Sequence, residues 1–300
     1  MSEKKVKVKA PAYIRHQRIT AIWFLLPNIV GFVILNVYPL FRAGVLSFTN
    51  WDGFNKNDFV GFSNYVKLFQ DSTFLISLGN TLLYTVATVP LAVFFGILMA
   101  LLMNVKFRSI KIFRTIYFLP QVTSMIAIGL VWSLILANNG PVNQFLMWLG
   151  VHNPPKWISS TQWALVSVEI VSVWRSMGYN AIILLAGLQG VNTELYEAAK
   201  LDGANSWQRF IHITLPGISP TIFFVLVTQM ISSCKVFDII MAMTQGGPGR
   251  ATNVLAYFVY QKSFTEYKFG YACSAAFILF GIIMLFTLIQ FIGQKKWVNY

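Results

Sequence analysis

The chain has 300 residues, of which 56% are hydrophobic and only 11% are charged, whereas soluble domains carry about 25% charged residues. With a mean hydropathy of +0.61, this composition argues against a soluble globular protein and indicates a polytopic membrane protein. The net charge of +13 does not indicate nucleic-acid binding, because the basic residues flank apolar runs and form no face interleaved with aromatic residues.

Six apolar stretches are long enough to cross the hydrocarbon core of a bilayer, which takes about 20 helical residues. They are residues 19–48, 75–103, 112–136, 163–188, 219–243 and 271–292. Pro27, Pro39, Pro90 and Pro120 lie inside or at the ends of these stretches, so we expect kinks there. The sequence therefore predicts an all-α integral membrane protein with six transmembrane helices.

Lysine and arginine residues are concentrated on one side of these spans. If the N-terminus is inside, fourteen of them lie in cytoplasmic segments and six in outer segments, as the positive-inside rule describes. The largest cytoplasmic groups are at residues 4–18 and 106–114. We therefore expect both termini to be cytoplasmic.

The fourth and fifth spans each carry a polar face. In the fourth span the polar residues follow helical spacing i, i+3, i+4 and i+7, and they are Ser172, Arg175, Ser176 and Tyr179. In the fifth span the corresponding residues are Gln229, Ser232 and Ser233. Polar groups at membrane depth normally face the bundle interior or a water-filled cavity, so we expect both faces to line one cavity as a substrate pathway. Hydrogen bonding that holds the helices together is the alternative.

Three charged residues near this face leave the chemistry of the solute open. Lys235 and Asp238 are spaced i and i+3, and we expect them to form a structural pair. Tyr, Trp, Ser and Gln side chains suit a neutral sugar, whereas the guanidinium of Arg175 matches a phosphate or carboxylate.

The sequence contains no catalytic or metal-binding pattern. It has no phosphate-binding loop of the G-x-x-x-x-G-K-[ST] type, and His16, His152 and His212 are scattered over the tail, an outer loop and a cytoplasmic loop. We therefore expect that this chain is not an enzyme and does not hydrolyse ATP itself. Cys234 and Cys273 predict no disulfide.

The polar loop between the fourth and fifth spans carries helix signals of its own. Thr193 can cap a first short helix, and Gly203 can end it. Ser206 can cap a second helix, which Pro216 stops. Between the two lies a surface of small groups where the backbone of a partner could approach closely, formed by Ala198, Ala199, Gly203 and Ala204.

The pattern in this loop resembles the signature cytoplasmic loop of permease subunits of binding-protein-dependent ABC importers. The matching residues are Glu197, Ala198, Ala199, Asp202, Gly203 and Ala204, followed by Ile213, Leu215 and Pro216. Residues 113–120, 173–180 and 237–248 are similar to the carbohydrate branch of this family, of the maltose and glycerol-3-phosphate type. The resemblance covers roughly residues 26–300.

The resemblance implies a type I ABC importer permease fold in a bacterial cytoplasmic membrane, in contact with membrane lipid. It implies a heterodimer with a second homologous permease, two ATP-binding-cassette ATPase subunits and an extracytoplasmic substrate-binding protein. The nine matching loop residues would couple this chain to an ATPase, with Glu197 as a charge partner and Gly203 at the turn. We expect no cofactor to be bound by this chain, since ATP and Mg would be used by the ATPases.

This topology divides the chain into five parts. We expect a cytoplasmic basic tail at 1–18, a first transmembrane arm helix at 19–48 and an extracytoplasmic loop at 49–74. A five-helix core at 75–293 would include the cytoplasmic coupling loop at 190–217, and residues 294–300 would form a cytoplasmic C-terminus.

The function predicted from these observations is import of a sugar or oligosaccharide. The alternatives are import of an anionic sugar derivative, such as a uronide oligosaccharide or glycerol-3-phosphate, and an ion-coupled secondary transporter, which would need an acidic coupling site. A membrane scaffold or receptor without transport is a further alternative.

Overall fold

The computed structural model describes residues 12–105 and 108–298 of the chain. Within these ranges every regular element is a helix, and the only strand-like feature is an isolated bridge between Thr49 and Phe59. This confirms the all-α class. Most of the expected basic tail, Lys106 and the last two residues of the expected C-terminus lie outside the described residues.

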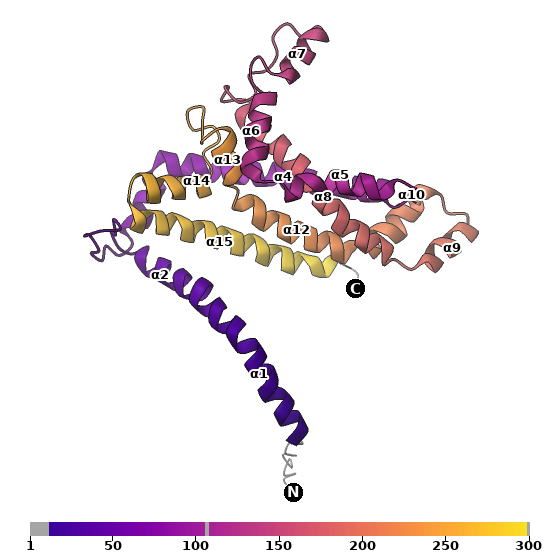
Figure 1. Ribbon diagram of the computed structural model, residues 1–300, viewed down its shortest axis with the longest axis horizontal. Coiled ribbons are helices and arrows are strands. Elements are labelled where there is room, and N and C mark those ends of the chain that lie inside the picture. The colour runs from indigo at the N-terminus through magenta and orange to yellow at the C-terminus, as the bar shows by residue number, and fades with distance from the viewer. Residues whose placement is uncertain (1–11, 106–107, 299–300) are drawn as a thin grey trace.

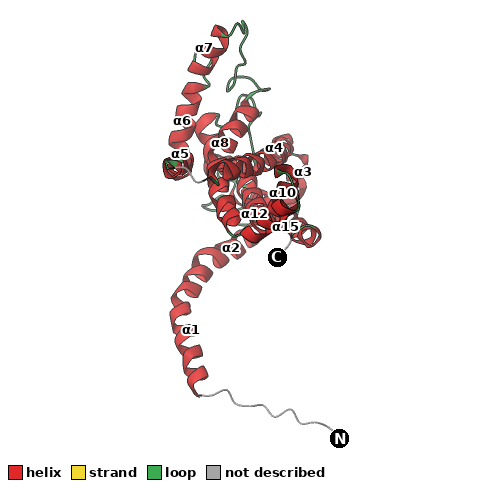
Figure 2. Ribbon diagram, turned by 90° about the vertical axis from the view of Figure 1, so that its right-hand side faces the viewer, coloured by secondary structure: helices red, strands yellow, loops and turns green. Residues whose placement is uncertain are grey.

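The bundle at the centre of the molecule is built from long apolar helices that run side by side (Figures 1 and 2). They are α4 (Ser72–Met103), α5 (Ile110–Val122), α8 (Ala164–Gln189), α12 (Ser219–Cys234) and α15 (Phe269–Gly293). The predicted fourth and sixth spans agree with α8 and α15 to within two residues at each end.

Four helical segments of the described chain are each long and apolar enough to cross a membrane, at residues 20–46, 72–103, 164–189 and 269–296. Two bent helix pairs, each of which is a broken span or a re-entrant loop by length and composition, are Ile110–Val122 with Met125–Ile135 and Ser206–Gly217 with Ser219–Cys234. The predicted number of six spans is reached when each bent pair counts as one span.

The first span is a single helical arm that leaves the bundle (Figure 1). It comprises α1 (Ala12–Phe32), a π-helical turn (Val33–Val37) and α2 (Tyr38–Leu46). This π-helical turn ends two residues before Pro39, and the amide of Tyr38 bonds to the carbonyl of Val33. None of the arm's most apolar window is buried within the chain, so lipid or another protein must cover it.

The third span is broken into two short helices. α5 and α6 (Met125–Ile135) have 13 and 11 residues and are bent by 99° relative to each other. At 1.5 Å per residue each is shorter than about 20 Å, so neither crosses a bilayer alone. The break at residues 123–124 follows Pro120, where we expected a kink. Beyond it, the chain turns away from α5, and α6 and then α7 (Pro141–Trp148) project from the side of the bundle (Figure 2).

The fifth span is shorter than predicted. α12 ends at Cys234, residues 235–237 are not helical, and a separate helix α13 (Asp238–Met243) follows. The expectation of one apolar span reaching Met243 was therefore wrong. α13 packs closely on α6, because a Cβ atom added at Gly129 would lie 2.5 Å from the Cβ of Ala242.

Small residues at the surface of α8, and one on α4, allow three neighbouring helices to approach α8 closely. A Cβ atom at Gly178 would collide with the backbone carbonyl of Tyr117 in α5, and one at Gly187 would lie 2.5 Å from Oγ1 of Thr221 in α12. On the α4 side, a Cβ atom at Gly96 would lie 2.8 Å from Cβ of Asn180. Small residues at helix contacts are typical of membrane bundles.

The two ends of the bundle carry different irregular structures (Figure 1). At one end lie the loop after α2, α3 (Ser63–Gln70), α14 (Leu255–Tyr260) and a π-helical turn (Gln261–Thr265). At the other end lies the hairpin of α9 (Thr193–Leu201) and α10 (Ser206–Arg209), which a π-helical turn (Phe210–Thr214) and α11 (Leu215–Gly217) connect to α12. A final 3₁₀ turn (Gln294–Lys296) follows α15.

Candidate functional site

A polar cavity of about 190 Å³ lies inside the bundle between α8 and α12. Six of the seven residues predicted for the substrate pathway line it, and they are Ser172, Arg175, Ser176, Gln229, Ser232 and Ser233. The helical spacing read from the sequence therefore brings these residues to one space. That they contact a solute stays a prediction.

One hydrogen bond connects the two helices across this cavity. Nε2 of Gln229 in α12 donates to Oγ of Ser176 in α8 at 3.3 Å, and Oγ of Ser176 also donates to the carbonyl of Ser172 at 2.5 Å. The predicted alternative, hydrogen bonding between the spans, thus occurs at the same residues that line the cavity. The two roles are compatible, because a hydroxyl or amide retains further donor or acceptor capacity.

The charged residues of the cavity are Arg175, Lys235 and Asp238. One guanidinium nitrogen of Arg175, Nη2, donates to the carbonyl of Gln121 at 3.2 Å, while its buried Nε has no hydrogen-bond partner among the described residues. No salt bridge joins Lys235 to Asp238 in the described chain, so the expected structural pair is not formed. Lys235 and Asp238 both line the cavity, together with Arg175.

The break between α12 and α13 forms one wall of the cavity. Lys235, Val236 and Phe237 have non-helical backbone and all line it. Non-helical backbone at membrane depth is tolerated where it is buried in protein or lines a water-filled space, since lipid cannot satisfy its polar groups. The break is therefore consistent with a hydrated pathway at this point.

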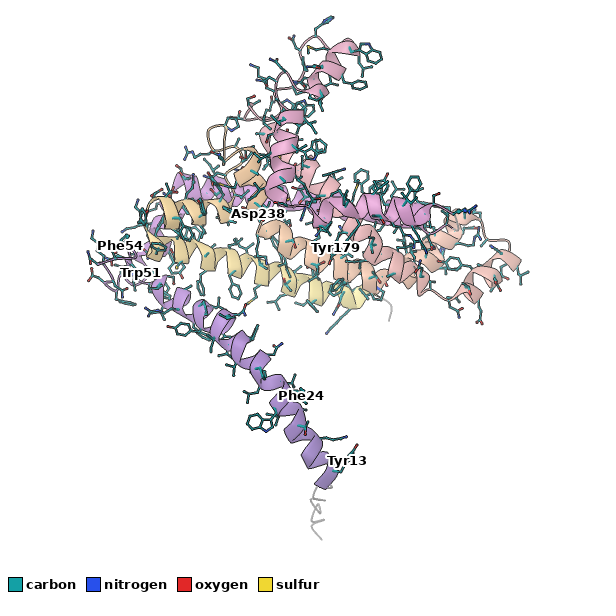
Figure 3. All side chains as sticks on the ribbon, in the orientation of Figure 1. Tyr13, Phe24, Trp51, Phe54, Tyr179 and Asp238 are labelled. Atoms are coloured by element: carbon teal, nitrogen blue, oxygen red, sulfur yellow. The ribbon has the colours of Figure 1, made fainter. Side chains whose placement is uncertain are left out.

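Tyr179 is the predicted pathway residue that does not line the cavity. It lies one turn beyond Arg175 and Ser176 on α8, and Figure 3 shows it closer than Asp238 to the α9–α10 end of the bundle. Tyr84 of α4 and Met125 of α6 line the cavity but were not identified from the sequence. Tyr84 does have a local signal, because it lies in a row of buried polar residues at helical spacing on α4, with Ser77, Thr81, Thr85 and Thr88. Met125 has no such signal. Lys235 and Asp238 could have been identified as lining residues, because they are charged residues within an apolar stretch.

The hairpin at the other end has the predicted helices with caps shifted by one residue. Asn192, not Thr193, caps α9 by accepting from the amide of Glu194 at 2.9 Å. Asn205, not Ser206, caps α10 and forms a capping box with Gln208. In each case the cap is the residue with extended backbone, and its side chain reaches the first free amides of the helix.

Gly203 ends α9 as predicted. Its φ of +81° is in the left-handed region that favours glycine. The amide of Gly203 bonds to the carbonyl of Lys200 at 3.1 Å, and that of Ala204 bonds to the carbonyl of Ala199 at 2.8 Å. These two bonds are the Schellman motif, which satisfies the last carbonyls of a helix.

The hairpin exposes apolar side chains although α9 is hydrogen-bonded to the π-helical turn that follows α10. The hydroxyl of Tyr196 in α9 hydrogen-bonds Oγ1 of Thr214 at 3.0 Å, which anchors the hairpin beside the start of α11. Leu201 is 90% exposed and Trp207 is 67% exposed. Glu197, Ala198, Asp202 and Gly203 are exposed as well, whereas Ala199, Ala204, Ile213, Leu215 and Pro216 are half-buried. Exposed apolar side chains of this kind mark a contact with another protein or with the membrane surface.

A family model described as "Binding-protein-dependent transport system inner membrane component" matches residues 92–298, which include the hairpin and all residues that line the cavity except Tyr84. The chain belongs to this family. The match begins within α4 and ends at the last described residue. The arm helix lies before it. Within the described residues, no group of three or more His, Cys, Asp or Glu residues could hold a metal ion in this permease.

Relatives that match this permease over nearly their whole length are transport proteins. A probable ABC transporter permease protein of Bacillus subtilis (strain 168) is 34% identical over 297 residues, which cover 98% of this chain and 96% of the relative. A lactose transport system permease protein of Rhizobium radiobacter is 33% identical over 94% of this chain and 96% of its own length.

Solved structures with the same fold come from ABC importers. A bacterial ABC transporter involved in the import of the acidic polysaccharide alginate matches 94% of this chain and 99% of the compared chain, with a TM-score of 0.82 and 25% identity. A bacterial alginate ABC transporter in complex with an alginate pentasaccharide-bound periplasmic protein matches 93% of this chain and 96% of that chain, with a TM-score of 0.81 and 25% identity.

Proposed function

We propose that this permease imports a sugar or oligosaccharide into the cytoplasm as part of an ATP-driven transporter. The observation that carries the proposal is the polar cavity between α8 and α12, whose wall includes the non-helical residues 235–237. Its hydroxyl and amide groups suit the hydroxyl groups of a saccharide. The names of relatives support a carbohydrate, since one is a lactose permease and another is a sulfoquinovosyl glycerol permease of Agrobacterium fabrum.

The energy for transport would come from partner subunits. Two ATPase subunits, which bind ATP and Mg, would grip the α9–α10 hairpin of this chain and of a second, homologous permease. This assignment is supported by the exposed Leu201 and Trp207 and by the fixed geometry of the hairpin. The hairpin and both termini would lie in the cytoplasm, in agreement with the distribution of basic residues.

An extracytoplasmic binding protein would deliver the solute at the opposite end of the bundle. The family's name and the alginate transporter solved with its periplasmic protein support such a partner. The surface available to it includes the loop after α2, where Figure 3 shows Trp51 and Phe54.

An anionic saccharide is the second candidate for the solute. The cavity contains two cationic residues, Arg175 and Lys235, against the single carboxylate of Asp238. The buried, unpaired Nε of Arg175 could donate to a carboxylate or phosphate group. The structural neighbours that import acidic alginate are consistent with this candidate.

Uptake by proteoliposomes that contain the complete transporter tests the proposal. With the binding protein outside and ATP inside, uptake of radiolabelled saccharide is expected to require ATP and to fall by about tenfold or more in Gln229→Ala with Ser176→Ala. An ion gradient without ATP should give no uptake. Uptake that depends on the gradient and not on ATP would instead support a secondary transporter, and no uptake of any saccharide would contradict the proposal.

A further inference from the structure

A second cavity, of about 720 Å³, opens at the end of the bundle opposite the hairpin. It lies between the loop after α2, helix α3 and residues 262–271, which lead into α15. Its volume is within the range of about 300–1,000 Å³ that is usual for small-molecule sites. All of its lining residues are charged, amide or aromatic, and none is aliphatic.

The carboxylates of this cavity are already satisfied by the protein. Glu266 forms salt bridges with Lys262 at 2.7 Å and Lys268 at 2.8 Å. Asp71 accepts from the hydroxyl of Tyr271 at 3.1 Å and caps α4 through the amide of Thr73 at 2.8 Å. Asp52 accepts from three backbone amides of its own loop at 2.9 to 3.1 Å. None of them therefore needs a bound cation.

Two cations of the cavity have no such partner. The exposed residues Lys56 and Lys67 line it, and neither forms a salt bridge among the described residues. With four lysines against three carboxylates, the lining has a formal charge of +1. A ligand that enters the cavity thus meets ammonium groups, which can only donate hydrogen bonds.

Two aromatic rings stand at the cavity with large exposed faces. The rings of Phe54 and Tyr267 are 5.7 Å apart between centroids, and these residues are 73% and 51% exposed. Tyr267 has a φ of +56°, in the left-handed region that is costly for a residue with a side chain. Flat aromatic faces suit the C–H faces of a sugar ring, whereas a lining without aliphatic groups offers no surface to an acyl chain.

We propose that this outer cavity binds an acidic saccharide. Lys56 and Lys67 would hold its anionic group, and a ring would pack on Phe54 and Tyr267. The site is separate from the cavity between α8 and α12, so the proposal does not depend on which solute that cavity carries.

Calorimetric titration of the full chain, purified with its associated subunits in nanodiscs of zwitterionic phospholipid, tests this proposal. The probes are a uronic-acid trisaccharide, a neutral trisaccharide of the same length and inorganic phosphate. The acidic trisaccharide is expected to bind at least about tenfold more tightly than the neutral one, and equimolar phosphate should not displace it. Lys56→Gln with Lys67→Gln should weaken binding by about tenfold or more, whereas Lys156→Gln, on another outer loop, should not change it.

Several results would overturn the proposal. They are equal binding of both trisaccharides, displacement by phosphate, loss of binding in nanodiscs that contain anionic lipid, and unchanged affinity in the double lysine variant. Binding that disappears in Ser176→Ala with Gln229→Ala would assign the ligand to the membrane cavity and equally contradict it. If the double lysine variant does not purify, the single variant Phe54→Leu replaces it. This variant removes an exposed ring and should weaken binding by itself.

Discussion

Single residues determine how the hairpin ends its first helix. Gly203 has room for a side chain, because no atom lies within 4 Å of where its Cβ would be, but its φ of +81° strains any residue other than glycine. The sequence predicted this glycine correctly and placed both N-caps one residue too late. Asn, Thr and Ser all cap helices well, so composition alone could not distinguish Asn192 from Thr193.

Replacement of Gly203 should therefore act through backbone strain and not through a clash. Gly203→Ala should destabilise the end of α9 by about 1 kcal/mol, whereas Gly203→Asn should cost less, because asparagine tolerates the left-handed region. Hydrogen exchange at the amide of Ala204 measures this difference, with about fivefold faster exchange expected in the alanine variant. Equal exchange rates in the two variants would show that the strain is not the cause.

The side chain of Glu266 should make the end of the molecule opposite the hairpin sensitive to acid. Partial burial alone would raise the pKa of Glu266, but hydrogen bonds and charges from Lys262 and Lys268 outweigh it and hold the pKa below its usual value of 4.5. Since the pKa is lower in the folded state, the carboxylate stabilises the fold above that value, and the contribution is lost as the pH falls further.

Thermal unfolding at pH values between about 6 and about 3.5 checks this dependence. The midpoint of the wild-type chain should fall more steeply than that of Glu266→Gln, which cannot titrate at this position. Parallel curves for the two proteins would exclude a contribution from this ion pair. Asp52 and Asp71, whose pKa values are also lowered, titrate in both proteins and so cancel in the comparison.

At the scale of helices, hydropathy predicted the long apolar helices but not where a span breaks. α8 and α15 are continuous and agree with the prediction, whereas the breaks at residues 123–124 and 235–237 interrupt apolar stretches. These breaks accompany packing between α6 and α13, which are far apart in the sequence. A window average of composition cannot detect such contacts. The polar faces of α8 and α12 were predictable, because their spacing is a local property.

The contact between α8 and α5 should be sensitive to one added methyl group. Gly178→Ala would place a Cβ atom against the carbonyl of Tyr117, so the helices must separate, at a cost of about 1–3 kcal/mol. The matched control is Gly281→Ala in α15, where no atom lies within 4 Å of the added Cβ. Thermal unfolding in detergent should show a lower midpoint for the first variant and an unchanged or higher midpoint for the second. A tolerated Gly178→Ala would contradict the close contact.

At the scale of the whole molecule, the arm is the part that the chain cannot bury by itself. Figure 1 shows α1 and α2 diverging from the bundle, and Figure 3 shows Tyr13 and Phe24 projecting from the arm. The sequence predicted a first span but contained no information on its position, because an apolar helix is compatible with lipid and with protein on either side.

A second permease should cover one face of this arm. Photo-crosslinking amino acids placed singly at residues 20–46 should crosslink to that subunit with a period of about 3.6 residues, since only one face of a helix can touch a partner. The remaining positions should react with lipid. Crosslinks at no position, or equally at all positions, would show that the arm is not held against a partner in this way.

The path from the hairpin to the cavity contains no flexible linker. The chain is helical from Ser206 to Cys234 apart from a bend of 64° at Ile218, and the last turns of this segment already line the cavity through Gln229, Ser232 and Ser233. If a solute in the cavity favours one orientation of this segment, it must change the affinity of the hairpin for its partner, and the partner must change the affinity for the solute by the same factor. Measured at equilibrium, those two factors should be equal.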